Sequence, residues 1–374
     1  MHVIQIMANN PSVPYFKWLA EEVHKHPGMK FTFIAMCSER PVMLDEMKER
    51  NCDCVWVKYD NKDRKAGMIK AFFELLKLFR KLKPDVVHTH LFDDSFPGLL
   101  AAKIAGVKKR VITKQDTTFH WYYAPKWVWA DRFNNRNATH LIAVTEENKE
   151  FILNSERADP KKIRLAHNGF PFDLMTNQSD ETKRKYIEKY GLQGKIVVGT
   201  VSRLIEWKGY VHIINAAERL VVKYPQIHFL FIGEGMQKKE LENLIAEKKL
   251  QNHITLTGWI DRADIPSLYG IMDVYAHAAK FEPFGFVIIE AMFNGVPVVS
   301  TATGVAKDAI VHEENGYLVA YKNMELLANG IEFMLENDGK AMGIKGTESA
   351  LKTFQFEQMF DRYKNIYFEE DRKN

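Results

Sequence analysis

Short apolar runs alternate with amphipathic segments from one end of the chain to the other. An uninterrupted apolar run of about four to eight residues is typical of a strand buried on both faces, and the amphipathic segments have the period of helices that cover such strands. This alternation predicts an α/β protein with doubly wound parallel sheets. The strands expected in the first half are Val3–Met7, Phe31–Ala35, Cys54–Val57, Val86–His90, Arg110–Thr113, His140–Val144 and Ile163–Ala166.

Helices are expected between these strands, and the second half of the chain repeats the pattern. The first-half helices are predicted at Pro14–Lys25, Met43–Arg50, Ala66–Lys83, Phe96–Ala105, Lys126–Ala138 and Glu146–Ser155. The second-half strands are predicted at Ile196–Val201, His228–Ile232, Ile254–Thr257, Asp273–His277, Val296–Ser300 and Gly316–Ala320. Its helices include Asp180–Lys189, Gly209–Lys223, Lys238–Lys248, Pro266–Met272 and a last one at about Glu357–Phe368.

A length of 374 residues is too great for one comfortable hydrophobic core. We therefore expect two domains, residues 1–172 and 173–355, followed by a terminal helix in residues 356–374. No apolar run is long enough to span a bilayer, and the N-terminus lacks a signal-peptide pattern. The three cysteines lack the spacing of a zinc site and indicate free thiols, so we expect a cytoplasmic protein.

The net charge of +4 is unevenly distributed, because residues 1–178 carry the basic excess. Nucleic acid would explain this excess, but no basic motif with interleaved aromatic residues occurs, whereas an anionic membrane surface or acceptor explains it equally well. The segment Ala66–Lys83 predicts an amphipathic helix that either meets anionic lipid or packs its apolar face on the sheet. Its apolar positions are Ile69, Phe72, Phe73, Leu76, Phe79 and Leu82, and its basic ones are Lys70, Lys77, Arg80, Lys81 and Lys83.

Two carboxylates, Glu282 and Glu290, stand eight positions apart around a Pro-Phe-Gly-Phe turn, and Gly-Val-Pro-Val-Val follows them. The order is loop, helix, glycine and buried strand, which leaves a helix N-terminus at the edge of the sheet. Free N–H groups at such an end favour phosphate, while the two carboxylates are spaced to bind hydroxyl groups of a sugar and of a ribose. The alternative is an ordinary β-α-β unit with solvated glutamates.

A second motif, Gly199–Gly209, opens the second domain with a strand, a short loop and a helix. The loop carries two cations, Arg203 and Lys208. A guanidinium can bind two phosphate oxygens and an ammonium adds a point charge, so this pair would neutralise a diphosphate leaving group without a metal ion. The alternative is a solvated loop.

With these motifs the chain resembles the retaining glycosyltransferases of family 4, whose fold, called GT-B, has two Rossmann-like doubly wound domains facing a central cleft. The resemblance spans nearly the whole chain and is strongest over residues 197–319. It implies transfer of a hexose or N-acetylhexosamine from a nucleotide sugar, which we expect to be a UDP-sugar, to a saccharide or lipid-linked acceptor in cell-surface polysaccharide synthesis. It also implies that the terminal helix returns to the N-terminal domain. Because the chain contains no Asp-x-Asp and carries the two cations, we expect that neither a cofactor nor a metal is required.

The resemblance assigns roles to individual residues. Glu282, Arg203 and Lys208 are the catalytic candidates, and Glu290 is expected to bind the ribose. The other donor-binding candidates are Phe284, Gly285, Phe286, Val287, Ile288, Gly258 and Trp259. On the acceptor or sugar side the candidates are Gln115, Asp116, His90, His120 and Asn10.

The sequence departs from the family pattern in two places. The loop at residues 8–13 lacks glycine, and Gln115 stands where similar sequences have a histidine. Glutamine can orient a hydroxyl group but cannot take its proton, although His120 could replace the histidine. These departures leave open a catalytically impaired nucleotide-sugar-binding protein of the same fold. An epimerase or a glucan phosphorylase fits less well, because the first lacks the paired glutamates and the second needs a longer chain, and nucleic-acid binding ranks last.

Overall fold

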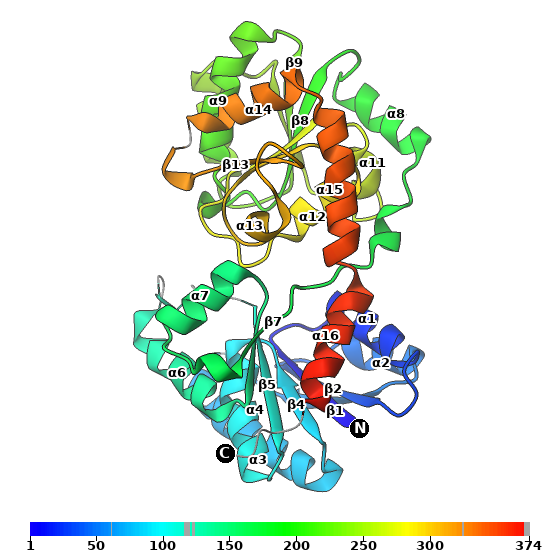
Figure 1. The fold of residues 1–374 in the computed structure, drawn as a ribbon, viewed down its shortest axis with the longest axis vertical. Helices are drawn as coiled ribbons and strands as arrows, with labels where there is room; N and C mark the ends of the chain where they lie inside the picture. The colour runs from blue at the N-terminus through cyan, green and yellow to red at the C-terminus, as the bar shows by residue number, and fades with distance from the viewer. Residues whose placement is uncertain (61, 116–119, 122–123, 324, 370–374) are drawn as a thin grey trace. The chain divides into compact units, whose positions relative to one another are not determined.

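The computed structural model describes residues 1–60, 62–115, 120–121, 124–323 and 325–369. The chain divides into two compact units, each with its own parallel sheet (Figure 1). Unit 1 comprises Met1–Gly169 and Phe356–Asn374, and unit 2 comprises Phe170–Gln355. Among the described helices, none has both the length and the apolar character needed to cross a bilayer.

Unit 1 contains a seven-stranded sheet in the order β3-β2-β1-β4-β5-β6-β7. Its strands are β1 His2–Ala8, β2 Lys30–Cys37, β3 Asp53–Lys58, β4 Val86–Thr89, β5 Lys109–Lys114, β6 His140–Ala143 and β7 Ile163–Leu165. Val3 of β1 lies in register with Phe31 on one side and Val86 on the other. Because the strand order reverses between β1 and β4, their carboxyl ends flank the crevice in which open α/β sheets bind ligands.

Helices cover both faces of this sheet (Figure 1). They are α1 Pro14–Val23, α2 Met43–Glu49, α3 Arg64–Leu82, α4 Phe92–Ile104, α6 Val128–Asn137, α7 Glu146–Asn154 and α16 Phe356–Phe368. Apolar residues of α1, α2 and α16 share one core, and those of α3 and α4 form another on the opposite face. Although α16 follows unit 2 in the chain, its Tyr367 hydroxyl bonds the buried His88 of β4 at 2.6 Å. His88 is thus a structural residue that fixes the terminal helix.

Unit 2 contains a six-stranded parallel sheet in the order β10-β9-β8-β11-β12-β13. Its strands are β8 Ile196–Val201, β9 Ile227–Ile232, β10 Ile254–Gly258, β11 Val274–His277, β12 Val298–Thr301 and β13 Tyr317–Val319. Its helices are α8 Asp180–Lys189, α9 Tyr210–Lys223, α10 Lys238–Glu247, α11 Ile265–Tyr269, α12 Phe286–Phe293, α13 Ala306–Ala309, α14 Leu326–Glu336 and α15 Gly339–Thr353. The core on one face joins α9, α10 and α14 to the sheet. Here the strand order reverses between β8 and β11.

Candidate functional site

The loops that follow β8 and β11 meet at the reversal point of unit 2. Gly209, with a φ of +73°, lies so close to the second loop that a Cβ atom would sit 2.0 Å from the carbonyl oxygen of Ala278. The backbone N–H of Lys280 donates to the carbonyl of Trp207 at 2.8 Å. Only glycine tolerates both that backbone conformation and that approach. The interlocked loops therefore hold Lys208 against the segment that carries Glu282.

Three polar side chains converge there: Lys208, Glu282 and His277. The Lys208 ammonium forms an ion pair with Glu282 Oε2, and His277 Nε2 donates to the same oxygen at 3.2 Å. The side chains of Lys208, Glu282 and His277 are only 13%, 9% and 1% exposed. Burial alone would raise the pKa of Glu282, but the hydrogen bond from His277 and the charge of Lys208 outweigh it and lower the pKa to about 2. At neutral pH Glu282 is thus a carboxylate that accepts hydrogen bonds and holds no proton.

This depressed pKa predicts an acid-dependent loss of stability. A carboxyl whose pKa is lower in the folded than in the unfolded chain stabilises the fold above its unfolded pKa, and that contribution disappears as the pH falls. For Glu282 the window runs from 4.5 down to about 2, and the contribution is roughly 3 kcal/mol at most. Urea unfolding from pH 6 to pH 3 should show a steeper acid limb for the wild type than for Glu282→Gln. Parallel curves would contradict the pairing.

The segment after Glu282 brings the start of α12 to the same place. Gly285 precedes the helix with a φ of +100°, and a Cβ atom there would lie 2.9 Å from the Glu282 side chain. Gly304, in the loop after β12, has a φ of +53° and would place a Cβ atom 2.6 Å from the carbonyl of Phe284. Three loops therefore pack around Glu282. The N–H groups of Phe286 and Val287 lie in the first turn of α12, where a helix favours an anion. The N–H of Ile288, also expected to face the diphosphate, donates instead to the carbonyl of Gly285 at 3.0 Å.

Glu290, the second carboxylate of the motif, is buried two turns along α12. Its carboxylate accepts two hydrogen bonds from Arg262, one of them at 3.2 Å, and one from the Tyr269 hydroxyl at 3.1 Å. Arg262 follows β10 and is half exposed, so its guanidinium closes the outer side of the carboxylate. A ribose diol that binds Glu290 must share it with Arg262 or displace that side chain. Sequence reasoning missed Arg262, since no local motif marks it.

The remaining donor candidates lie along the same edge of the unit 2 sheet. Arg203 follows β8, is exposed and makes no ion pair with the described part of the chain. Gly258 ends β10 with a φ of +76°, and its carbonyl accepts from Gly233 N–H at 3.0 Å. Trp259 comes next and is exposed. The structure therefore joins Lys208 directly to Glu282 but leaves Arg203 and Trp259 open to solvent.

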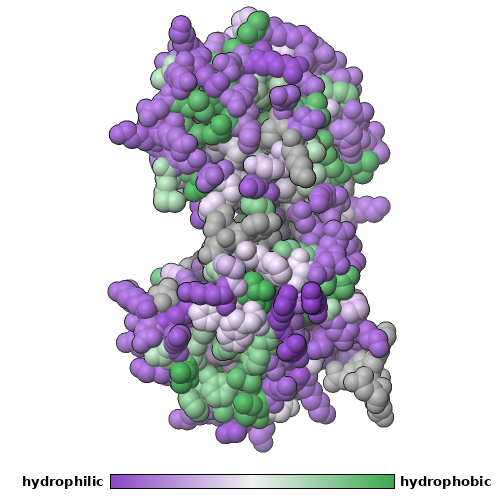
Figure 2. Space-filling view, turned by 90° about the vertical axis from the view of Figure 1, so that its left-hand side faces the viewer, coloured by the Kyte–Doolittle hydropathy of each residue, from purple (hydrophilic) through white to green (hydrophobic). Residues whose placement is uncertain are grey.

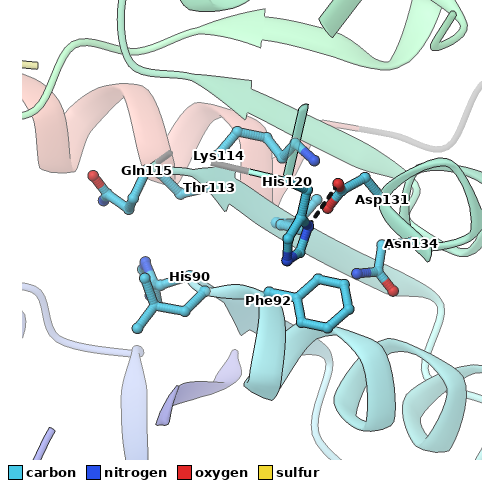
Figure 3. A pocket seen from close by; sticks show the side chains of 10 residues that line it. His90, Phe92, Thr113, Lys114, Gln115, His120, Asp131 and Asn134 are labelled. Atoms are coloured by element: carbon cyan, nitrogen blue, oxygen red, sulfur yellow. Dashed lines mark hydrogen bonds and ion pairs between the residues drawn. The ribbon is translucent and has the colours of Figure 1, made fainter. Parts of the chain in front are cut away.

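Unit 1 has a cavity of about 170 Å³ at the carboxyl ends of β4 and β5 (Figure 3). Its lining residues are His90, Leu91, Phe92, Ile112, Thr113, Lys114, Gln115, His120, Asp131 and Asn134. His120 lies at the centre of this group, and its Nδ1 atom is 2.8 Å from the Asp131 carboxylate. This contact fixes the orientation of the His120 ring, whose other nitrogen is Nε2.

Two buried polar atoms in the cavity lining lack a hydrogen-bond partner among the described residues: His90 Nδ1 and Asn134 Oδ1. His90 Nε2 bonds Gln5 Oε1 at 2.8 Å, and burial lowers the pKa of His90 to about 3, so its ring is neutral at physiological pH. Lys114 is held by the buried Glu156 at 2.9 Å. Both atoms are acceptors, and unpaired polar atoms are costly in a protein interior, so each would be satisfied by a hydrogen bond donated from a separate hydroxyl group of a bound sugar. No sequence signal had marked Asn134, which lies on an ordinary amphipathic helix.

Gln115 and the first loop, the two departures from the family pattern, have ordered roles in unit 1. Gln115 exchanges hydrogen bonds with Asn168, the shorter at 2.9 Å from Asn168 Nδ2 to Gln115 Oε1. Asn9 takes the positive φ of 61° that glycine would otherwise supply, and its side chain donates to Asp93 at 2.7 Å. Asn10 donates to the carbonyl of Ala8, within its own loop. Asp116 lies outside the described residues.

Comparison with known proteins identifies both halves of the chain. Residues 19–174 match the family described as Glycosyltransferase Family 4, and residues 182–347 match Glycosyl transferases group 1. Together these two matches span most of both units.

Individual relatives agree with the family matches. The chain is 26% identical, over 80% of its length and 79% of the relative's, to UDP-Gal:alpha-D-GlcNAc-diphosphoundecaprenol alpha-1,3-galactosyltransferase of Escherichia coli. It is also 26% identical to the capsular polysaccharide biosynthesis glycosyltransferase CapM of Staphylococcus aureus, with 80% of each chain covered. The crystal structure of Anabaena HepE in complex with UDP superimposes with a TM-score of 0.82 at 21% identity, over 98% of this chain and 99% of that one. This protein thus belongs to the group 1, family 4 glycosyltransferases and has their GT-B fold.

Proposed function

We propose that the protein transfers a hexose or N-acetylhexosamine from a UDP-sugar to a saccharide or lipid-linked acceptor in cell-surface polysaccharide synthesis, with retention of the anomeric configuration. The observation that carries this proposal is the buried cluster of Lys208, Glu282 and His277 at the reversal point of the unit 2 sheet. That position is where open α/β sheets bind nucleotides. The cluster also places a cation beside the start of α12, which suits a diphosphate.

The choice of uridine and of a saccharide acceptor is supported by the relatives. The name of the Escherichia coli relative specifies UDP-galactose as donor and a sugar on diphosphoundecaprenol as acceptor. Structures of HepE have been solved with UDP and with UDP-glucose. In this chain the base would lie near the backbone of Gly258 and Trp259, and backbone groups by themselves do not favour one base over another.

We infer a reaction in which the bond to the diphosphate breaks and the bond to the acceptor oxygen forms on the same face of the sugar. The bond between the anomeric carbon and the diphosphate breaks, and Lys208 and Arg203 take up the negative charge that develops on the departing phosphate. The acceptor hydroxyl oxygen then attacks from the same face, and its proton passes to that phosphate. With a pKa near 2, Glu282 is a poor proton acceptor, so its role is to orient sugar hydroxyl groups.

Product analysis tests the stereochemistry and the metal requirement. Proton NMR of the fresh product should show the same anomeric configuration as in the donor, and EDTA should leave the rate unchanged, because cationic side chains already neutralise the leaving group. An inverted anomer would contradict retention. Activity that EDTA abolishes and manganese restores would contradict metal independence.

A panel of nucleotide sugars tests the donor. A ligand that binds only the folded protein raises the apparent stability by mass action, by about 2.7 kcal/mol at a hundred times its Kd. We expect a UDP-sugar to raise the Tm more than its GDP or ADP counterparts do. A donor hydrolysis assay on the same samples separates an enzyme from a catalytically impaired nucleotide-sugar-binding protein, which would show the Tm shift without release of UDP.

A further inference from the structure

Large apolar side chains gather on the outer face of three neighbouring helices of unit 1, and we call this surface the aromatic face. Ile69 and Phe73 of α3 and Trp129 of α6 are 60%, 62% and 55% exposed. Between them lie half-buried aromatic side chains, which are Phe72, Phe92, Phe96 and Trp127. Figure 2 views this side of the molecule and shows hydrophobic residues gathered on the surface of unit 1. Clusters of exposed apolar side chains often mark sites of contact with a protein or a membrane.

The aromatic side chains form connected ring contacts across α4 and α6. The Phe96 ring lies 5.9 Å from that of Trp129, and the Trp129 ring lies 6.3 Å from that of Trp127. Phe92 joins Trp127 at 5.8 Å, and Arg64 covers both of these rings. On the neighbouring helix α3, which packs along α4, the Phe72 and Phe73 rings lie 5.1 Å apart. Phe92, Phe96, Trp127 and Trp129 therefore form one connected cluster of rings, and the residues of α3 lie on the helix beside it.

The structure corrects the predicted division of α3 into one apolar and one basic face. The buried residues of α3 include Met68, Ala71, Leu75 and Phe79, and of these four only Phe79 belongs to the predicted apolar face. One side of α3 therefore packs on the sheet, as the second of the two expectations for this helix had it. Ile69 and Phe73 point away from that core and remain for a partner outside unit 1.

Exposed cations surround the apolar residues of α3. Those that make no ion pair with the described part of the chain are Lys65, Lys70, Lys77, Arg80, Lys81 and Lys83. Glu74 is the single acidic residue within α3. This positive charge disfavours a dimer in which the face packs on the same face of a second copy, because the two-fold contact would bring like charges together. It favours a surface with apolar depth and negative charge, which is what an anionic bilayer presents to Trp, Phe and Lys side chains.

The aromatic face also borders the cavity of unit 1. Phe92 contributes to both, since its ring lies 5.8 Å from Trp127 on the face and 4.4 Å from His120 in the cavity. A molecule with a polar head and an apolar tail could therefore place the head beside His120, His90 and Asn134 while its tail stays on the aromatic side of Phe92. A free saccharide has no apolar tail that would contact the aromatic face.

We propose that the aromatic face lies on the surface of an anionic bilayer and that the neighbouring cavity takes the saccharide head of a lipid-linked acceptor. This inference rests on the proposed sugar transfer for the identity of the head group, whereas the docking itself rests on the surface alone. The aromatic side chains supply apolar contact in the interfacial layer. The surrounding lysines supply attraction that salt weakens over a Debye length of about 8 Å at physiological ionic strength.

Vesicle co-sedimentation tests the docking with full-length protein. The wild type should sediment with vesicles of phosphatidylcholine and phosphatidylglycerol, and less so with phosphatidylcholine alone or in high salt. The pair Phe73→Ser with Trp129→Ser should lower the partition coefficient at least tenfold, and Lys70→Glu with Lys77→Glu should remove the preference for anionic lipid. Val222→Ser, which alters an 82% exposed apolar residue of unit 2, is the matched control and should bind as the wild type does. All substituted positions are exposed, and unfolding curves check that each variant is folded.

Two further results separate this inference from the proposed function. The Phe73→Ser, Trp129→Ser variant should hydrolyse donor at the wild-type rate and glycosylate a short-chain soluble acceptor normally, but lose transfer to a lipid-linked acceptor in vesicles. Equal binding to neutral and anionic vesicles, or binding unaffected by the aromatic variant, would overturn the docking even if transfer occurs. Absence of donor hydrolysis with intact vesicle binding would overturn only the proposed function. Binding of the aromatic face to a protein instead of to vesicles would also contradict the docking.

Discussion

Replacing Lys208 with alanine is expected to lower kcat/KM for the donor by two orders of magnitude or more, and to weaken the binding of UDP. Loss of one preorganised group that stabilises developing negative charge typically lowers kcat by a factor of about 100 to 1,000. In this protein the effect has a second source. Glu282 would lose its cation while remaining buried, and removal of one partner of a buried ion pair typically destabilises a protein by about 3–5 kcal/mol. Steady-state kinetics, UDP calorimetry and urea unfolding measure the three effects separately.

The neighbouring cation provides a comparison. Arg203→Ala should lower donor turnover by about an order of magnitude or more, but without the loss of stability, because Arg203 is exposed and has no ion pair among the described residues. Lys345→Ala, which removes an exposed lysine of α15, is the control and should change neither property. Near-normal turnover in both the Lys208 and Arg203 variants would exclude this edge of unit 2 as the phosphate site.

The sheet strands could be predicted because each is a nearly continuous apolar run buried on both faces. The second strand of unit 2, predicted at His228–Ile232, begins one position earlier in the structure, at Ile227. Helices α14 and α15 were missed. Glycines interrupt the helical pattern of α15, and one of them, Gly343, is required for packing, because a Cβ atom there would lie 2.1 Å from the carbonyl of Gly295. A local propensity rule penalises glycine in a helix and cannot register such a tertiary contact.

Individual site residues were more predictable than their partners. Lys208 and Glu282 each stood in a recognisable motif, but their contact joins residues 74 positions apart and depends on how two loops interlock. The same holds for Arg262, which pairs with Glu290, and for Asp131, which orients His120. A pattern along the chain identifies the group that carries chemistry. The group that holds it in place comes from another strand or helix, so only the fold reveals it.

Replacing Glu282 with glutamine is expected to have a kinetic signature opposite to that of the Lys208 variant. The amide keeps the shape of the side chain but loses the charge that pairs with Lys208, so the ammonium becomes freer to bind phosphate. We therefore expect UDP to bind as tightly as to the wild type or more tightly. Turnover of the UDP-sugar should nevertheless fall by roughly a hundredfold, because the carboxylate no longer orients the sugar in the transition state.

Calorimetry with UDP and with the intact UDP-sugar, followed by initial rates, distinguishes the two roles. A carboxylate that only keeps Lys208 in place would give weaker UDP binding and slower turnover together in Glu282→Gln, as in Lys208→Ala. A sugar-orienting carboxylate separates them, with unimpaired UDP affinity and a reduced kcat. The double variant supplies the last check. If the two side chains act on the same transition state, its kcat/KM should fall by less than the product of the two single losses, since the contact between Lys208 and Glu282 can be lost only once.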